Sequence, residues 1–298
     1  MRIILINQNL LTIAFYILAI LCSCSNDVND ISSRSLTDPS KPFEGRDKPY
    51  YSELSGKSKL DLSCLKDDNT GTSDVINLLS TIDEELTNVL GDEVTLEEEV
   101  RLGGQFHEEF KKENRFLTTG YAIENIKEIL KNLTRKLGAT SKYTYSIYLI
   151  ESNDINAFTI GSKIYITSAF YKFCKSNDEI AVAISHEIYH NELGHTKQLI
   201  QKQRALPEEF HTILSMLTIS FGQKKELECD LYGIDLAIQC DYDVCSGMHL
   251  MKRLKAIEAR DNKNPMESFF RSHPNSDIRA SCIHSHIENN YNFNCPNE

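Results

Sequence analysis

Three residues in the stretch ISHEIYHNELGH have the types and the spacing of a hydrolytic metal site. His186 and His190 stand at i and i+4, so on a helix their imidazoles share one face and can reach a single ion. Zinc suits two neutral imidazoles plus a carboxylate, and it lowers the pKa of a bound water to roughly 7. Glu187 can take the proton from that water, and the hydroxide can attack a peptide carbonyl. The motif predicts one Zn²⁺ per chain, with both histidines as ligands and Glu187 as the catalytic base.

The flanking residues predict the helix that positions this motif. Ser176 and Glu179 have the spacing of a capping box, which marks a helix start. Isoleucines then recur at every fourth position as far as Ile188, and Gly194 can end the helix. Two unpaired histidines on such a partly buried helix, near 177–194, would be costly, which favours metal ligation.

A catalytic zinc site needs a third protein ligand, and two of the candidates are weak. His195 is placed one residue short of the third histidine in HExxHxxGxxH motifs. If the helix continued through Gly194, His195 would point about 180° away from His186, so a surface position or a contact behind a ligand suits it better. Glu209 has a spacing similar to that of thermolysin-type enzymes, but after Pro207 it suits a solvated acid in a first helical turn.

Glu226 is the preferred third ligand. It forms an i, i+4 pair with Asp230 on a second helix with apolar periodicity. One carboxylate can bind the zinc, while the other accepts a hydrogen bond from the free ring nitrogen of a ligand histidine.

Four ordered segments within residues 94–285 resemble one family of zinc metalloproteases. It includes HtpX, the CAAX prenyl protease and BepA (metallopeptidase family forty-eight). The segments are VTLEEEVRLGGQF (94–106), NAFTIGSKIYITSAF (156–170), the HExxH motif with the downstream ELECD, and FRSHPNSDIRAS (270–281). This resemblance implies a mostly helical zincin-type domain with a small β-sheet beside the HExxH helix.

The resemblance also implies residue roles. His186, His190 and Glu226 would be ligands, Glu187 the base and proton shuttle, and Asp230 the residue that orients a ligand histidine.

Other implied roles concern the substrate. Asn156, Ala157 and Phe158 would lie near an edge strand that holds an extended substrate by backbone hydrogen bonds. His273 would either approach the metal and hold the enzyme closed or steady the developing oxyanion, with Arg279 bracing its segment. The chain departs from the family at Cys229, usually alanine, and at 162–163, where glycines are common.

The N-terminus resembles a bacterial lipoprotein signal. An apolar run from Leu10 to Leu21 precedes Leu21-Cys22-Ser23-Cys24, in which Cys24 would be lipidated. Residues 1–23 are therefore expected to be a signal peptide and 24–60 a flexible tether, poor in aliphatic residues. Residues 61–298 would be the metallopeptidase domain, lipid-anchored at the outer membrane and facing the periplasm.

Hydrophobic periodicity predicts an α+β fold for that domain. Helices are expected near 73–90, 96–112, 118–138, 177–194, 208–222, 223–240 and 244–260, and strands at 144–151 and 163–167. The asparagine-rich final residues support no assignment.

Composition limits the partners. A net charge of −11 without a basic cluster argues against nucleic acid, and the acidic run 83–99 is expected to be a solvated helix face. In an oxidising periplasm the cysteines beyond Cys24 can pair; 240 with 245 and 282 with 295 are close in sequence, but connectivity stays open.

The expected function is that of a zinc-dependent metalloendopeptidase of the cell envelope. Its substrates would be polypeptides, in particular misfolded envelope proteins. The alternative is a periplasmic chaperone or assembly factor that uses the same groove with little or no proteolysis.

Overall fold

The computed structural model describes residues 93–205, 221–258 and 276–296, together with positions 60, 62, 64, 216 and 273. The predicted signal peptide, nearly all of the tether and the helix expected near 73–90 lie outside these residues, as do Pro207 and Glu209. Among the described helices, none is long and apolar enough to cross a membrane.

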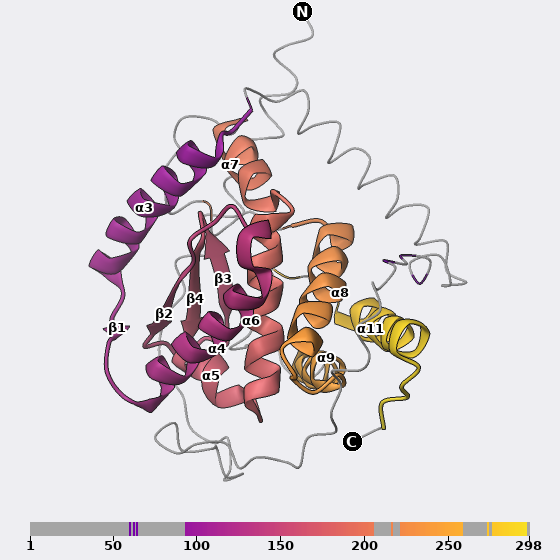
Figure 1. Cartoon of the computed structure of the whole chain (residues 1–298). Coiled ribbons are helices and arrows are strands. Elements are labelled where there is room, and N and C mark those ends of the chain that lie inside the picture. Colours follow the sequence, from indigo (N-terminus) through magenta and orange to yellow (C-terminus); the bar gives the residue numbers. More distant parts are fainter. Residues whose placement is uncertain are drawn as a thin grey trace, which may run out of the picture. The chain divides into compact units, whose positions relative to one another are not determined.

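The described residues form the predicted α+β fold, a mixed four-stranded sheet with helices packed on both faces (Figure 1). The strands lie in the order β1–β2–β4–β3. Their bounds are β1 Phe116–Leu117, β2 Ser146–Ile150, β3 Ala157–Ile160 and β4 Lys163–Thr167. β2 and β4 are parallel, whereas β1 and β3 run antiparallel to their neighbours, and β3 ends the described sheet.

Helices surround this sheet. They are α3 (Leu96–Glu113), α4 (Tyr121–Leu137), α5 (Ser168–Phe173), α6 (Asn177–Glu192), α7 (His195–Ala205), α8 (Gln223–Gln239), α9 (Ser246–Glu258) and α11 (Ser276–Tyr291). The predicted helices near 96–112, 118–138, 177–194, 223–240 and 244–260 are α3, α4, α6, α8 and α9. α5, α7 and α11 were not predicted as separate helices, and the helix expected near 208–222 lies almost entirely outside the described residues.

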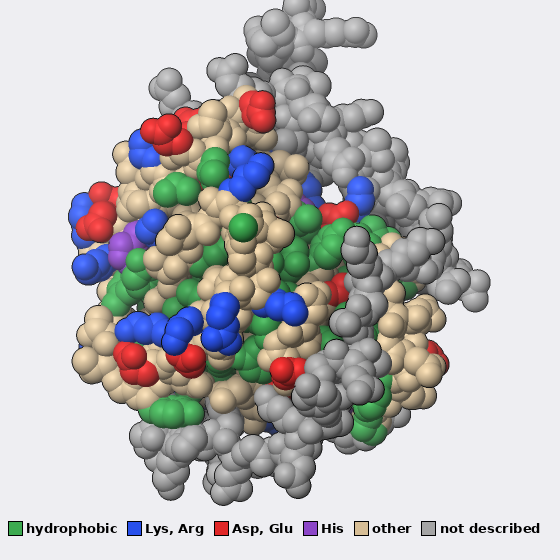
Figure 2. Space-filling model, in the orientation of Figure 1, with side chains coloured by type: hydrophobic (Ala, Val, Ile, Leu, Met, Phe, Trp, Pro, Cys, Tyr) green, Lys and Arg blue, Asp and Glu red, His purple; other side chains and the backbone are tan. Residues whose placement is uncertain are grey.

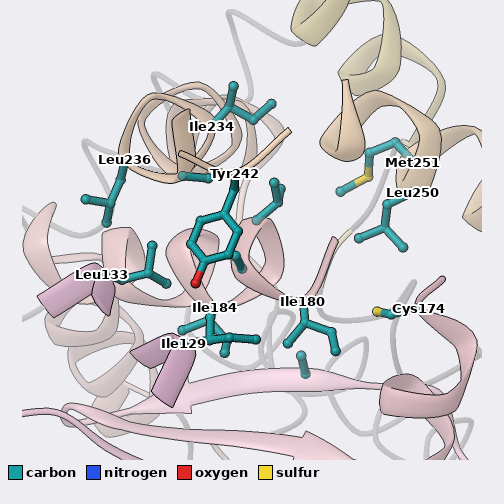
Figure 3. Packing of buried hydrophobic residues seen from close by; sticks show 14 of the residues in the cluster. Ile129, Leu133, Cys174, Ile180, Ile184, Ile234, Leu236, Tyr242, Leu250 and Met251 are labelled. Atoms are coloured by element: carbon teal, nitrogen blue, oxygen red, sulfur yellow. The ribbon is translucent and has the colours of Figure 1, made fainter. Parts of the chain in front are cut away.

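Alternation along the strands divides the core into two clusters. Ile164 and Ile166 of β4 face the larger cluster, which holds the inward faces of α4, α6, α8 and α9. Tyr165, between them, faces the smaller cluster, where Phe106 and Phe110 of α3 cover the opposite face. Figure 3 shows the larger cluster, with Tyr242 directed among its aliphatic side chains.

The β3–β4 turn depends on two residues with positive φ. Gly161 has φ 54° and Ser162 has φ 68°, the left-handed region that a two-residue hairpin turn requires. A Cβ on Gly161 would lie 2.5 Å from the backbone oxygen of Glu99, so α3 packs directly on this turn. Ser162, where the resembling family commonly has glycine, donates its backbone N–H to Asn191 Oδ1 at 2.9 Å, which secures the turn to α6.

α6 begins as the sequence indicated. The Ser176 side chain accepts from the Glu179 N–H at 3.3 Å. The Glu179 carboxylate accepts instead from the Lys175 N–H at 2.7 Å and from Arg253 of α9, so it ties the helix start to a neighbouring helix.

α6 and α8 cross with almost no side chain between them. A Cβ on Gly233 would lie 2.9 Å from the backbone nitrogen of His186, so only glycine allows this approach. The close crossing brings one face of α8 against the histidine face of α6.

Two disulfides secure the C-terminal part. Cys64 pairs with Cys282 of α11, and Cys245 pairs with Cys295. Neither pair of cysteines that are close in sequence is bonded, because the fold rather than chain proximity places the sulfur atoms. Cys174, Cys229 and Cys240 are free thiols.

The acidic run is not uniformly solvated, which corrects the prediction. Glu99 is buried and accepts hydrogen bonds from the hydroxyls of Tyr143, at 2.8 Å, and of Thr196. Glu97, by contrast, is exposed.

Charges of both signs mix on the described part of the face in Figure 2. Exposed pairs such as Lys127–Glu124 and Lys131–Glu128 lie one turn apart on α4. Each contributes at most about 1 kcal/mol to stability.

Candidate metal centre

α6 presents two imidazoles on one buried face. His186 Nε2 and His190 Nε2 lie 3.0 Å apart, and the two residues are 5% and 0% exposed. Burial lowers the pKa of His190 well below its usual range, so its ring is neutral, as a ligand must be.

α8 brings a carboxylate to both histidines. Glu226 Oε2 lies 3.4 Å from His186 Nε2, and Glu226 Oε1 lies 3.4 Å from His190 Nε2. Burial raises the pKa of Glu226, but the charges of His273 and Arg279 outweigh it and hold that pKa well below its usual range. The acid is therefore ionised.

These three donor groups fit a divalent ion. Ligand bonds of about 2.0–2.1 Å at tetrahedral angles separate the donor atoms by about 3.3 Å. The observed separations are 3.0 to 3.4 Å. In addition, Glu226 Oε1 is buried without a hydrogen-bond donor among the described residues, and an ion would satisfy it.

Arg279 of α11 and Asp230 of α8 form a buried ion pair next to the candidate ligands. Arg279 of α11 donates to both oxygens of Asp230, at 2.6 and 2.7 Å, and also lies 3.0 Å from Glu226 Oε2. Asp230 Oδ1 lies 2.9 Å from His186 Nδ1, on the side of the ring away from the centre. Burial lowers the pKa of His186, but the hydrogen bonds and charges of Asp230 and Glu226 outweigh it and raise that pKa to about 9. Without an ion His186 therefore carries a second proton, which metal binding must displace from Nε2, whereas the Nδ1 proton stays hydrogen-bonded to Asp230 and orients His186 as a ligand.

Glu187 lies inside the same site. It is 2% exposed, its Oε1 lies 3.5 Å from His273 Nε2, and its Oε2 has no hydrogen-bond donor among the described residues. Burial raises its pKa above the usual value. A raised pKa makes a carboxylate a stronger base, which suits a group that must accept a proton and then return it.

His273 completes the inner wall of the site. Its Nδ1 lies 2.8 Å from Glu226 Oε2, and its Nε2 lies 3.1 Å from the carbonyl oxygen of Ala157 on β3. Together with His186, His190 and Glu226 it forms a buried group of four possible ligands.

A cavity of about 340 Å³, counting space open to solvent, borders Glu187 and His273. Its apolar wall includes Phe170 of α5, Val182 of α6 and Leu254 of α9.

The three residues predicted for the substrate strand lie in different surroundings. Ala157 is buried, and its carbonyl oxygen contacts His273. Phe158 packs against the smaller core cluster, which α3 covers. The Asn156 backbone forms hydrogen bonds with Thr167 just before β3 begins.

Two further residues contact the site, of which the sequence analysis anticipated one as an alternative and missed the other. Of the two positions that the sequence left open for His195, the structure shows the one behind a ligand, because Gly194 at φ 75° ends α6 and turns the buried His195 back toward His190. The Phe221 ring stacks on His190 with 3.9 Å between centroids. No sequence signal indicated the Phe221 contact.

The sequence is similar to those of known peptidases. Residues 122–214 match the profile of Peptidase family M48. The chain is 25% identical over 214 residues to the mitochondrial metalloendopeptidase OMA1 of Schizosaccharomyces pombe, covering 64% of this chain and 61% of that protein. It is 26% identical over 163 residues to the beta-barrel assembly-enhancing protease of Yersinia pestis, covering 46% of this chain and 33% of that protein.

Proposed function

We propose that this chain, which carries a domain of peptidase family M48, is a zinc-dependent endopeptidase that cleaves polypeptides. The observation that carries the proposal is the convergence of His186, His190 and Glu226 at 3.0–3.4 Å with Glu187 beside them. When bound, the zinc ion would polarise the scissile carbonyl and acidify the attacking water.

The side chains divide the remaining work. The Glu187 carboxylate accepts the proton of the attacking water and then delivers it to the leaving amine. Among the described residues no strand pairs with the outer edge of β3, so this edge can offer backbone groups to an extended peptide, and the Ala157 carbonyl contacted by His273 belongs to it. A substrate strand would compete with His273 for that oxygen.

The test of the base is Glu187→Gln, which removes its basicity and leaves the donor atoms of the ligands in place. We expect unchanged zinc content and loss of casein cleavage. Casein cleavage at the wild-type rate by this variant would refute the role.

The ligand set has its own test. Glu226→Gln should reduce zinc content measured by metal analysis, whereas the matched variant Glu209→Gln should not. The reverse result would move the third ligand to Glu209.

We also propose that the enzyme acts in quality control at the cell envelope, anchored by a lipid on Cys24. The sequence around Cys24 and the name of the Yersinia pestis relative support this. Incorporation of labelled palmitate into the wild type, and its loss in Cys24→Ser, is the expected result.

A chaperone function is the second candidate, favoured by the contacts of His273 with both Glu187 and Glu226. Equal rescue of a deletion strain by the wild type and Glu187→Gln would support it over proteolysis.

A further inference from the structure

The two predicted histidine ligands differ in what holds them from behind. The outer nitrogen of His186 faces a carboxylate, Asp230 Oδ1 at 2.9 Å. The outer nitrogen of His190 faces another imidazole, His195 Nδ1, at 3.3 Å.

At the contact between His190 and His195, metal binding requires a defined protonation state of both rings. For Nε2 of His190 to bind an ion, its proton must sit on Nδ1, which then needs an acceptor. His195 Nδ1 can accept only if its own proton sits on Nε2, and that nitrogen lies 3.6 Å from Glu228 Oε2. Glu228, His195 and His190 therefore form a chain of contacts, called here the relay, in which Glu228 lies within ion-pair range of His195 and His195 lies within hydrogen-bond range of His190.

Bulk water does not reach the contact between His190 and His195 in the described structure. His190 is 0% and His195 is 3% exposed, and the Phe221 ring covers one face of His190. Without His195, the Nδ1 proton of His190 would be buried and unpaired, which disfavours the tautomer that binds metal.

One other group reaches the same nitrogen. Cys229 Sγ lies 3.4 Å from His195 Nδ1 and is fully buried, so a thiol proton would compete with His190 for the same lone pair. Cys229 therefore weakens the relay rather than forming part of it.

We propose that His195, oriented by Glu228, is the positioning residue that holds His190 in its metal-binding tautomer. This inference rests on the proposed function, since it assumes that His190 binds zinc.

The test measures metal binding by the full chain rather than proteolysis. Zinc affinity is obtained by competition with a chromophoric chelator, and the visible spectrum of the Co²⁺-loaded protein reports the geometry at the ion. His195→Leu removes the acceptor and should weaken zinc binding by about 10–100-fold, the usual effect of losing such a partner. His195→Asn, whose side-chain oxygen lies close to the position of Nδ1, should restore most of the affinity and the wild-type Co²⁺ spectrum.

Two further variants keep the test decisive if His195→Leu does not fold. Glu228→Gln, at a partly exposed site, should weaken zinc binding in the same direction but less. Cys229→Ala should leave the affinity unchanged or increase it. His286→Gln is the matched control, because His286 is equally buried but contacts Asp235 far along α8, and it should alter neither readout.

The outcomes separate the two proposals. Failure of the wild type to bind Zn²⁺ or Co²⁺ would overturn the proposed function and this inference together. Wild-type binding with equal affinity in His195→Leu, or in Glu228→Gln should His195→Leu not fold, would overturn only the relay. A loss in Cys229→Ala as large as in His195→Leu would assign the role to the thiol instead.

Discussion

The crossing of α6 and α8 gives the sharpest prediction for the geometry of the centre. In Gly233→Ala the new Cβ would lie 2.9 Å from His186 N and 3.2 Å from His186 Cα. Both partners are backbone atoms, so no side-chain rotation relieves the overlap. Restoring an ordinary contact of about 3.4 Å requires the helices to separate by about 0.5 Å.

That displacement should affect stability and metal binding together. Overpacking of a buried contact costs typically about 1–3 kcal/mol. Because α8 also carries Glu226 and Asp230, the same movement spreads donor atoms whose tolerance is about 0.5 Å. We expect a lower midpoint in urea unfolding and weaker zinc binding.

Gly247→Ala is the matched control. Its Cβ would lie 2.8 Å from Ile234 Cδ1, the far end of a flexible side chain, which can rotate away. It should cost less stability and leave zinc affinity unchanged. Wild-type stability and zinc affinity in Gly233→Ala would refute the view that this crossing sets the ligand spacing.

Three other perturbations have defined outcomes. His273→Ala should raise casein cleavage if this residue holds the site closed, and a fall in cleavage would instead support stabilisation of the oxyanion. Burial raises the pKa of Glu99, so the protonated acid is favoured in the fold, and stability is lost as pH rises through that raised pKa. Glu99→Gln should therefore gain stability relative to the wild type in urea unfolding as the pH rises above the ordinary glutamate value of 4.5, and a constant difference would contradict this. Replacing Cys245 and Cys295 with serine should cost about 2–5 kcal/mol in the same assay, and an unchanged unfolding midpoint would show that the disulfide adds nothing.

Local signals explain why much of the fold was predictable. The α6 start followed from a side-chain cap at Ser176, and β2 and β4 from runs of β-branched and aromatic residues. α11 was missed because its sequence has little apolar periodicity, and its buried face depends on contacts with α8 and α9. Tertiary packing, not local propensity, makes this segment helical.

The site shows the same division between local and long-range information. The HExxH spacing predicts that His186 and His190 share one face of α6. The i, i+4 spacing predicts that Glu226 and Asp230 share one face of α8. The sequence left His195 open between a surface position and a contact behind a ligand, and the positive φ of Gly194, which ends α6, decides for the second. The disulfides were out of reach for a related reason, because Cys64 and Cys282 are 218 residues apart.

The position of His273 connects these observations to control of the site. Three groups that proteolysis would require are in contact with this one ring: the Glu226 carboxylate, Glu187 Oε1 and the Ala157 carbonyl. A peptide could therefore pair with β3 and approach Glu187 only after the ring leaves. Arg279 Nη1 lies 3.5 Å from the His273 carbonyl oxygen, while the same guanidinium binds Asp230. Because one side chain links the His273 backbone to the carboxylate behind His186, weakening that link should release His273 and loosen His186 together. Loss of Arg279 is thus expected to lower metal affinity as well as open the site, whereas His273→Ala should only open it.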